Sequence, residues 1–198
     1  MSKRHHPYGI ALATTLLLVA QSCTSSTSPS TTQRTIEVEA VASTFESLEA
    51  MAQASEIIVE GEIIEVADGR FQPHPINEGE GDLGLSLTIE IASVLKGDVE
   101  PGETVTVPWA GGYYVEPDGT RIPLVINGQA HPEVGENSLW FLGPHPDGGA
   151  TWGLVAFEGR LLVEDNGELA LTTHRLDSGA ALELNAMTVD EVRQALSN

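Results

Sequence analysis

Leu85-Ser86-Leu87-Thr88-Ile89-Glu90-Ile91 alternates large apolar residues with polar ones at every position. Successive side chains of a β-strand point to opposite faces of its sheet, so this alternation predicts a strand with one buried face. We expect the strand to run on to about Leu95, where Lys96-Gly97-Asp98 turns the chain. Such a strand needs further strands beside it.

Similar patterns lie on both sides of this stretch. Some segments alternate in the same way, while the unbroken apolar run from Leu139 to Leu142 is typical of a strand covered on both faces. Asp165-Asn166-Gly167 is a hairpin signal between the last two segments. The further expected strands are 57–63, 105–109, 139–142, 152–157, 160–164 and 168–171. They predict a mainly β fold, a small antiparallel OB-like barrel or sandwich.

Short helices are expected near both ends of this strand region. Ser43 and Glu46 have the spacing of a capping box and predict a helix that ends near Ser55. Thr188 and Glu191 repeat that spacing and predict a C-terminal helix. We therefore expect a single β-rich domain over residues 36–198.

Four segments resemble an uncharacterised group of exported bacterial β-domains. They are Ala54 to Gly61, Val94 to Gly97, Gly111-Gly112, and Gly135-Glu136 leading to Trp140-Phe141-Leu142. A helix followed by this first strand is also distantly similar to the OB-like barrel of netrin and metalloproteinase-inhibitor domains. Those domains depend on cysteines, which are missing from this region of the chain. The resemblance covers about residues 45 to 145 and implies a barrel, with no activity attached.

The N-terminus has the three parts of a secretory signal. Lys3 and Arg4 form a basic start, an apolar run extends from Ile10 to Ala20, and the small Ser22 precedes Cys23. A helix of that run would rise only about 16 Å, against roughly 30 Å of hydrocarbon in a bilayer. Residues 1–22 are therefore predicted to be a signal peptide.

Cys23 is the only cysteine of the chain. The segment from Leu18 to Cys23 resembles the lipobox of bacterial lipoproteins, although Ala20 and Gln21 depart from the commonest residues. The resemblance implies acylation of Cys23 and a protein tethered outside the cytoplasm to a cell membrane or outer membrane. Residues 23–35, rich in Ser and Thr, would then be the anchor and a flexible tether. The alternative is ordinary cleavage that releases a free protein.

The charge of the mature chain excludes some partners. After removal of residues 1–22, 9 − 2 = 7 basic residues face 29 acidic ones, which gives a net charge of 7 − 29 = −22. Nucleic acids and anionic lipid surfaces are bound through lysine and arginine clusters, so we expect neither as a partner. The membrane is reached through the lipid. An unknown protein, peptide or glycan ligand remains open, and we expect a monomer.

The segment Trp109-Ala110-Gly111-Gly112-Tyr113-Tyr114 is the favoured candidate for binding. The glycines would let a ligand approach the backbone, and Trp109, Tyr113 and Tyr114 would offer stacking faces. The alternative is that Trp109 ends a strand pointing inward while the tyrosines pack over the mouth of the barrel. We expect residues 67–82 and 109–134 to be loops at the binding end.

Residues 67–82 also contain acidic side chains that could hold calcium. Asp68, Glu78, Glu80 and Asp82 offer hard oxygen ligands, but the spacing of an EF-hand is absent. The alternative is a mobile acidic loop. No cofactor other than this calcium ion is suggested by the sequence.

Known catalytic motifs give no support for an enzyme. Ser93 and Lys96 match S-x-x-K, but in a strand residues three apart face opposite sides, and the later K-T-G motif is missing. We therefore expect a membrane-tethered, non-catalytic binding or interaction domain. The alternatives are a cell-envelope hydrolase with a site formed only in three dimensions, and a calcium-stabilised structural module.

Overall fold

The computed structural model describes residues 34–41, 43–146, 151–173, 178–185 and 187–197. Within these ranges strands outnumber helices, and the prediction of a mainly β fold with short flanking helices is confirmed. The strands are β1 Ile36–Val38, β2 Ile57–Pro73, β3 Gly81–Lys96, β4 Thr104–Val115, β5 Arg121–Ile126, β6 Asn137–Pro144, β7 Trp152–Leu154, β8 Arg160–Val163 and β9 Leu169–Leu171. The helices are α1 Leu48–Ala54, α2 Gly179–Leu184 and α3 Val189–Leu196, with one 3₁₀ turn, η1 Phe157–Gly159.

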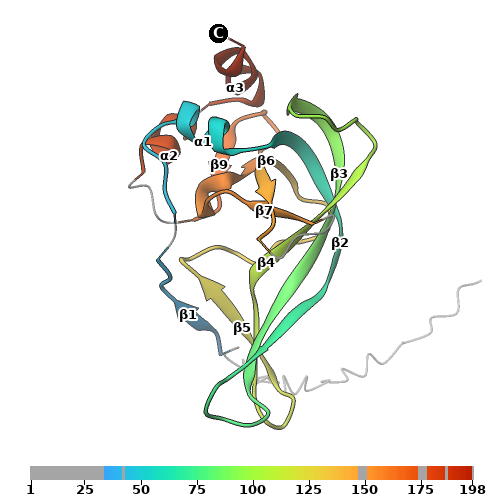
Figure 1. Cartoon of the computed structure of the whole chain (residues 1–198), viewed down its shortest axis with the longest axis vertical. Coiled ribbons are helices and arrows are strands. Elements are labelled where there is room, and N and C mark those ends of the chain that lie inside the picture. Colours follow the sequence, from blue (N-terminus) through green and yellow to red (C-terminus); the bar gives the residue numbers. More distant parts are fainter. Residues whose placement is uncertain (1–33, 42, 147–150, 174–177, 186, 198) are drawn as a thin grey trace, which may run out of the picture. The chain divides into compact units, whose positions relative to one another are not determined.

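All the strands join one sheet, in the order β1-β5-β4-β3-β2-β6-β8-β9, with β7 beside β6. The pair β1–β5 is parallel and the other pairs are antiparallel. The sheet is not closed, because β1 and β9 stand at its two ends. It curls nevertheless: the isolated bridge between Thr106 and Thr151 brings the start of β7 to β4, so these strands surround one apolar interior (Figure 1).

The central strands β2 and β6 are covered on both faces. Ile57 and Val59 face the interior of the curled sheet, whereas Ile58 faces the helices. On β6, Trp140 and Leu142 face the interior while Leu139 and Phe141 face the helices, and all four side chains are fully buried. The predicted doubly covered strand at 139–142 is confirmed, since each face of this run has its own apolar partner.

The helices lie over the second of these faces. Leu48 and Met51 of α1, Ala180 and Leu184 of α2, and Val192 of α3 pack in one cluster against the sheet. Figure 1 shows the three helices at one end of the described chain and the tip of the long β2–β3 hairpin at the other. These short helices are held mainly by packing, because isolated helices of this length are unstable in water.

The helix boundaries partly match the sequence expectations. Thr188 and Glu191 form a complete capping box at the start of α3, as predicted. The prediction for the first helix was wrong at its start: Ser47, not Ser43, accepts the hydrogen bond from the Ala50 N–H. The helix ends at Ser55 as predicted.

Lys96 closes the C-terminal end of α1. Its Nζ donates to the carbonyl oxygens of Ala52 at 2.7 Å and Ser55 at 2.6 Å. These are carbonyls that an α-helix leaves without partners, and a cation at this end also opposes the helix dipole. The lysine of the S-x-x-K match is therefore bonded to backbone carbonyls of α1 and its C-cap. The serine is bonded elsewhere, since Ser93 Oγ donates to Glu60 Oε2 at 2.9 Å.

The expectation of loops at 67–82 and 109–134 was wrong over most of the first segment and half of the second. β2 continues to Pro73 and β3 begins at Gly81, which leaves a short connection at 74–80. β4 continues to Val115, and β5 occupies part of the second segment. Both extensions are stabilised by backbone pairing with neighbouring strands, which is a tertiary effect that local sequence does not report.

Gly61 lies at an irregularity in the pairing of β2 with β3. The pairing register between β2 and β3 shifts between Glu60 and Gly61. A Cβ atom at Gly61 would lie 2.7 Å from the carbonyl oxygen of Glu90, closer than side chains allow. The glycine therefore permits the close approach of β3 at this irregularity.

None of the described helices is long and apolar enough to cross a membrane. Cys23 and the predicted signal peptide lie outside the described residues, so lipidation stays a prediction.

Candidate functional site

Trp109, the first residue of the predicted binding platform, points into the interior of the curled sheet. Its side chain is 4% exposed and packs with Val107 and Leu85. The guanidinium carbon of Arg160 lies 5.3 Å from the centre of its ring. Of the two readings of this tryptophan, the structure agrees with the inward-pointing one.

The two glycines of the platform belong to a β-bulge. Gly112 pairs with Gly84, but the next pair is Trp109 with Leu85, so Ala110 and Gly111 are the extra residues on β4. A Cβ atom at Gly112 would lie 2.3 Å from the Leu83 carbonyl oxygen. The structure thus gives Gly112 a role in the approach of two strands.

Tyr113 and Tyr114 are half-buried and have different partners. The Tyr113 ring contacts the His131 ring edge to face, with centroids 5.4 Å apart, and the Arg121 guanidinium carbon lies 5.7 Å from its centre. The Tyr114 hydroxyl donates to Glu80 Oε2 at 2.5 Å. This hydrogen bond raises the pKa of Tyr114 and lowers the pKa of Glu80, to which Asn77 also donates.

The four candidate calcium ligands are engaged separately or exposed. Asp68 lies in β2 and accepts two hydrogen bonds from Arg121, at 2.8 and 2.7 Å, which hold the pKa of its carboxyl below the usual range. Glu80 is bonded to Tyr114, while Glu78 and Asp82 are exposed. Across the described residues, no group of three His, Cys, Asp or Glu side chains is placed to hold a metal ion.

A buried arginine, which the sequence reasoning missed, lies at the centre of the interior. Arg160 is 2% exposed, and its guanidinium carbon lies 5.3 Å from the centre of the Trp109 ring and 5.2 Å from that of Trp140. Its Nη2 donates to Glu136 Oε2 at 2.6 Å. Burial lowers the pKa of Arg160, and the Glu136 carboxylate opposes that shift. The sequence signal that could have indicated this buried arginine is its place at the start of an apolar strand.

A cleft of about 760 Å³ lies beside β7, and we call it the Trp152 cleft. Three separate parts of the chain form it: the connection between α1 and β2, the turn between β3 and β4, and the ends of β6 and β7. Its walls include Glu56, Val99, Glu103, Thr104, Val105 and Trp152.

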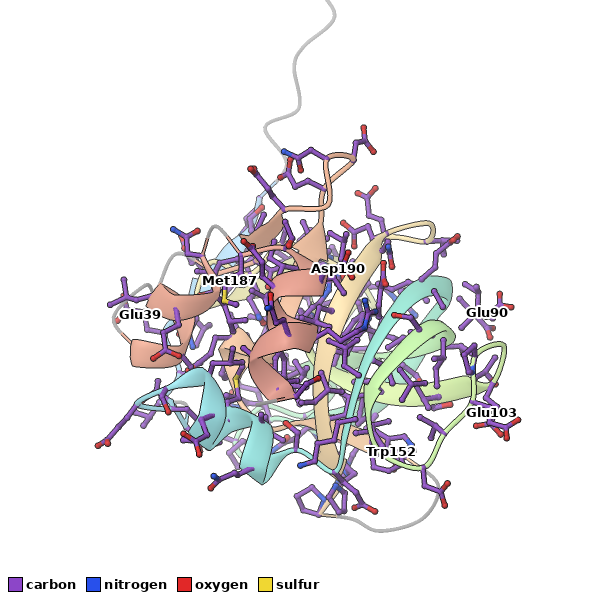
Figure 2. All side chains as sticks on the ribbon, turned by 90° about the horizontal axis from the view of Figure 1, so that it is seen from above. Glu39, Glu90, Glu103, Trp152, Met187 and Asp190 are labelled. Carbon is purple, nitrogen blue, oxygen red and sulfur yellow. The ribbon has the colours of Figure 1, made fainter. Side chains whose placement is uncertain are left out.

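Trp152 and the two glutamates of the Trp152 cleft are accessible to solvent. Trp152 is half-buried, in contrast to the buried Trp109 and Trp140, and Glu56 and Glu103 are exposed. Figure 2 shows Glu103 and Trp152 among the side chains seen from the helical end. Among the described residues neither carboxylate has an ion-pair partner, and no lysine, arginine or histidine lines the cleft.

Two other hollows lie on the described surface. One, of about 370 Å³, lies over Trp109 and is partly lined by Gln129, whose amide donates to the Phe157 carbonyl at 2.9 Å. The other is a groove of about 680 Å³ between α1 and α3, where Lys96 is already bonded to backbone carbonyls. The Trp152 cleft differs from both in combining an accessible aromatic face with uncompensated charge.

Comparison with known proteins gives no family assignment. No protein-family model matches the chain, and a search of curated proteins finds no match.

Proposed function

We propose that this protein is an exported lipoprotein, held at a membrane through acylated Cys23, whose β-rich domain binds a ligand in the Trp152 cleft without chemical conversion. The cleft is the observation that carries the binding part of this proposal. Its volume of about 760 Å³ falls within the range of roughly 300–1,000 Å³ that is usual for ligand sites. Its indole and carboxylates are free to contact a ligand.

The anchoring part of the proposal is supported by the sequence of the N-terminus. Residues 1–22 have the pattern of a signal peptide, and the sole cysteine follows at the acceptor position of a lipobox-like segment. A single cysteine has no partner for a disulfide within its chain. The polar residues between Cys23 and Arg34 have the composition of a flexible spacer.

A hydrolase is the second candidate, because Glu56 and Glu103 line the same cleft. Glycosidases use two carboxyl groups in different surroundings, one of them in an apolar environment that keeps it protonated. Both glutamates of the cleft are exposed, so neither has that environment. We therefore prefer the binding function.

The anchor is tested by the intact mass of the mature N-terminus, purified from membranes of the producing cell. We expect Cys23 to be the first residue and to carry a diacylglyceryl group, since more than one acyl chain is needed for stable attachment. The Cys23→Ser variant should leave the membrane fraction. A free Cys23 thiol, or cleavage at another position, would overturn the lipoprotein assignment.

The cleft is tested by binding to the full mature chain carrying Cys23→Ser. The probes are tri-N-acetylglucosamine, a neutral Ala-Gly-Ser peptide and a lysine-arginine peptide, each followed by calorimetry and tryptophan fluorescence. We expect at least one probe to bind and to lose at least tenfold in affinity in Trp152→Ala. Binding of no probe, or binding that is insensitive to Trp152, would reject the cleft. Release of new reducing ends or new amino groups from a bound probe would favour the hydrolase.

A further inference from the structure

We infer that the Trp152 cleft binds lysine or arginine side chains of a polypeptide; this inference rests on the proposed binding function. The lining residues carry the argument. Glu56 and Glu103 supply negative charge, Trp152 supplies an aromatic face, and Val99 and Val105 supply apolar walls. A long basic side chain has the matching parts, a charged head and an apolar stem.

The negative charge in the cleft is uncompensated within the described residues. Each described ion pair lies elsewhere: Arg34 with Glu116, Arg121 with Asp68, Arg160 with Glu136 and Arg193 with Asp190. Lys96 is bonded to the carbonyls of Ala52 and Ser55. A cation from another molecule would therefore meet no competing charge on the walls of the cleft.

The indole of Trp152 adds a preference for organic cations. An ammonium or guanidinium group over the face of tryptophan is attracted by the ring quadrupole, and tryptophan is the strongest aromatic partner of this kind. The same protein already pairs arginine with tryptophan in its interior, where Arg160 lies over Trp109 and Trp140. The half-buried Trp152 and the two glutamates line the same cleft. No lysine or arginine is among the lining residues, so no cation of the cleft wall occupies the face of this indole.

Further acidic residues lie along the strands that lead away from the cleft. Glu90 of β3 is exposed and pairs in register with Thr104, a residue of the cleft wall. Glu100 is exposed in the turn between β3 and β4, and its N–H donates to Glu103 Oε2. Figure 2 shows Glu90 and Glu103 at the same edge of the described molecule. Charges of one sign around a cleft attract the opposite charge over a distance.

This spread of charge favours a polypeptide over a free amine. One ammonium in an exposed site gains little from each ion pair, so a single free amine is expected to bind with a Kd of about 1 mM or weaker. A segment with several basic side chains can occupy the cleft and also meet Glu90 and Glu100. Several such contacts made together are needed for micromolar affinity.

The test uses the full mature chain with Cys23→Ser and fluorescein-labelled peptides followed by polarisation. The basic peptide alternates lysine and arginine with alanine. Matched peptides carry acetyl-lysine and citrulline, which remove the charge, or glutamate. N-acetyl-lysine amide tests the free amine, and 1 mM calcium chloride tests whether a metal ion occupies the carboxylates instead.

We expect the basic peptide to bind at least tenfold more tightly than the neutralised peptide, and to weaken as salt is added. Glu56→Gln and Glu103→Gln should each weaken binding about three- to tenfold. Trp152→Phe should weaken it less than Trp152→Ala. Glu39→Gln is the matched control, since Glu39 is exposed and does not line the cleft, and it should change affinity less than twofold. Unchanged melting temperatures check that the variants fold.

Each other outcome rejects the inference in a defined way. Equal binding of the basic and neutralised peptides would exclude a cation as the ligand group. An equal loss in Glu39→Gln and Glu56→Gln would show that only overall charge matters. Free amine binding as tightly as the peptide would reject the polypeptide, and displacement by calcium would favour a metal site. Binding of the glycan alone would reject basic side chains but leave the proposed binding function standing.

Discussion

The strand β2 has two halves that share one backbone but differ in burial. From Ile57 to Glu62 it pairs with β3 on one edge and β6 on the other, and its apolar residues are almost wholly buried. From Glu65 to Pro73 it pairs only with β3, and Phe71 is 43% exposed. Pairing with a second neighbour, β6, therefore places the inner half in the core. There the helices cover one face of the sheet, and the interior of the curled sheet covers the other.

The largest expected effect comes from Ile63, which directly follows the inner half and is buried like it. Ile63→Ala should lower the free energy of unfolding by about 3–4 kcal/mol, because Ile63 is 0% exposed and its truncation leaves a cavity in the interior. The measurement is urea denaturation of the mature chain with Cys23→Ser, followed by circular dichroism.

Ile64→Ala is the matched control, since it changes the same residue type at the next position. Ile64 is 42% exposed and lies where the register between β2 and β3 shifts. Its truncation should cost about 0.5 kcal/mol or less. Equal losses in the two variants would contradict the difference in burial.

A second test compares the two arginine–carboxylate pairs beside the two halves. Glu136→Ala should cost about 3 kcal/mol, because Arg160 would remain 2% exposed without its counter-charge. Asp68→Ala removes a carboxylate of the outer half, where both partners are about half exposed, and should change stability little. Similar losses in urea denaturation would show that the burial of Arg160 does not decide the effect.

The smallest effect is the pH dependence of the outer pair. Hydrogen bonds from Arg121 hold the folded-state pKa of Asp68 below the roughly 3.9 of an unfolded chain. A carboxyl with a lowered pKa adds stability above its unfolded pKa and loses it as pH falls through the folded pKa. The small advantage of the wild type over Asp68→Asn in urea should therefore be present at pH 6 and shrink as the pH falls below roughly 3.9. An advantage that grows on acidification would contradict the pair.

The inner strands were predictable because their patterns are local. The alternation from Leu85 to Ile91 indicates a strand with one buried face. The apolar run at 139–142 indicates a strand buried on both faces. The outer half of β2 was predicted as a loop, since Ala67-Asp68-Gly69-Arg70 contains residues typical of turns. Its strand depends on pairing with β3, and β1 likewise depends on β5, more than eighty residues away.

The candidate site was less predictable than the fold. Trp109 had two interpretations, a binding platform and an inward-pointing strand end, and its alternation with Val105 and Val107 favours the second. Glu56, Glu103 and Trp152 come from three distant segments, so only the folded chain reveals their common cleft. Arg160 was missed because a charged residue in a strand is ordinarily exposed.

The salt bridge of Arg34 has a practical consequence for the cleft. Arg34 contacts Glu116, next to Val115, which pairs with Gly81 at the tip end of the β2–β3 hairpin. Glu56 and Val99 of the cleft lie beyond the other end of that hairpin, roughly 50 Å of strand away. An attachment point placed at Arg34 would therefore lie far from the cleft. The hairpin acts as a built-in spacer, and protein immobilised at that point should keep its full binding capacity.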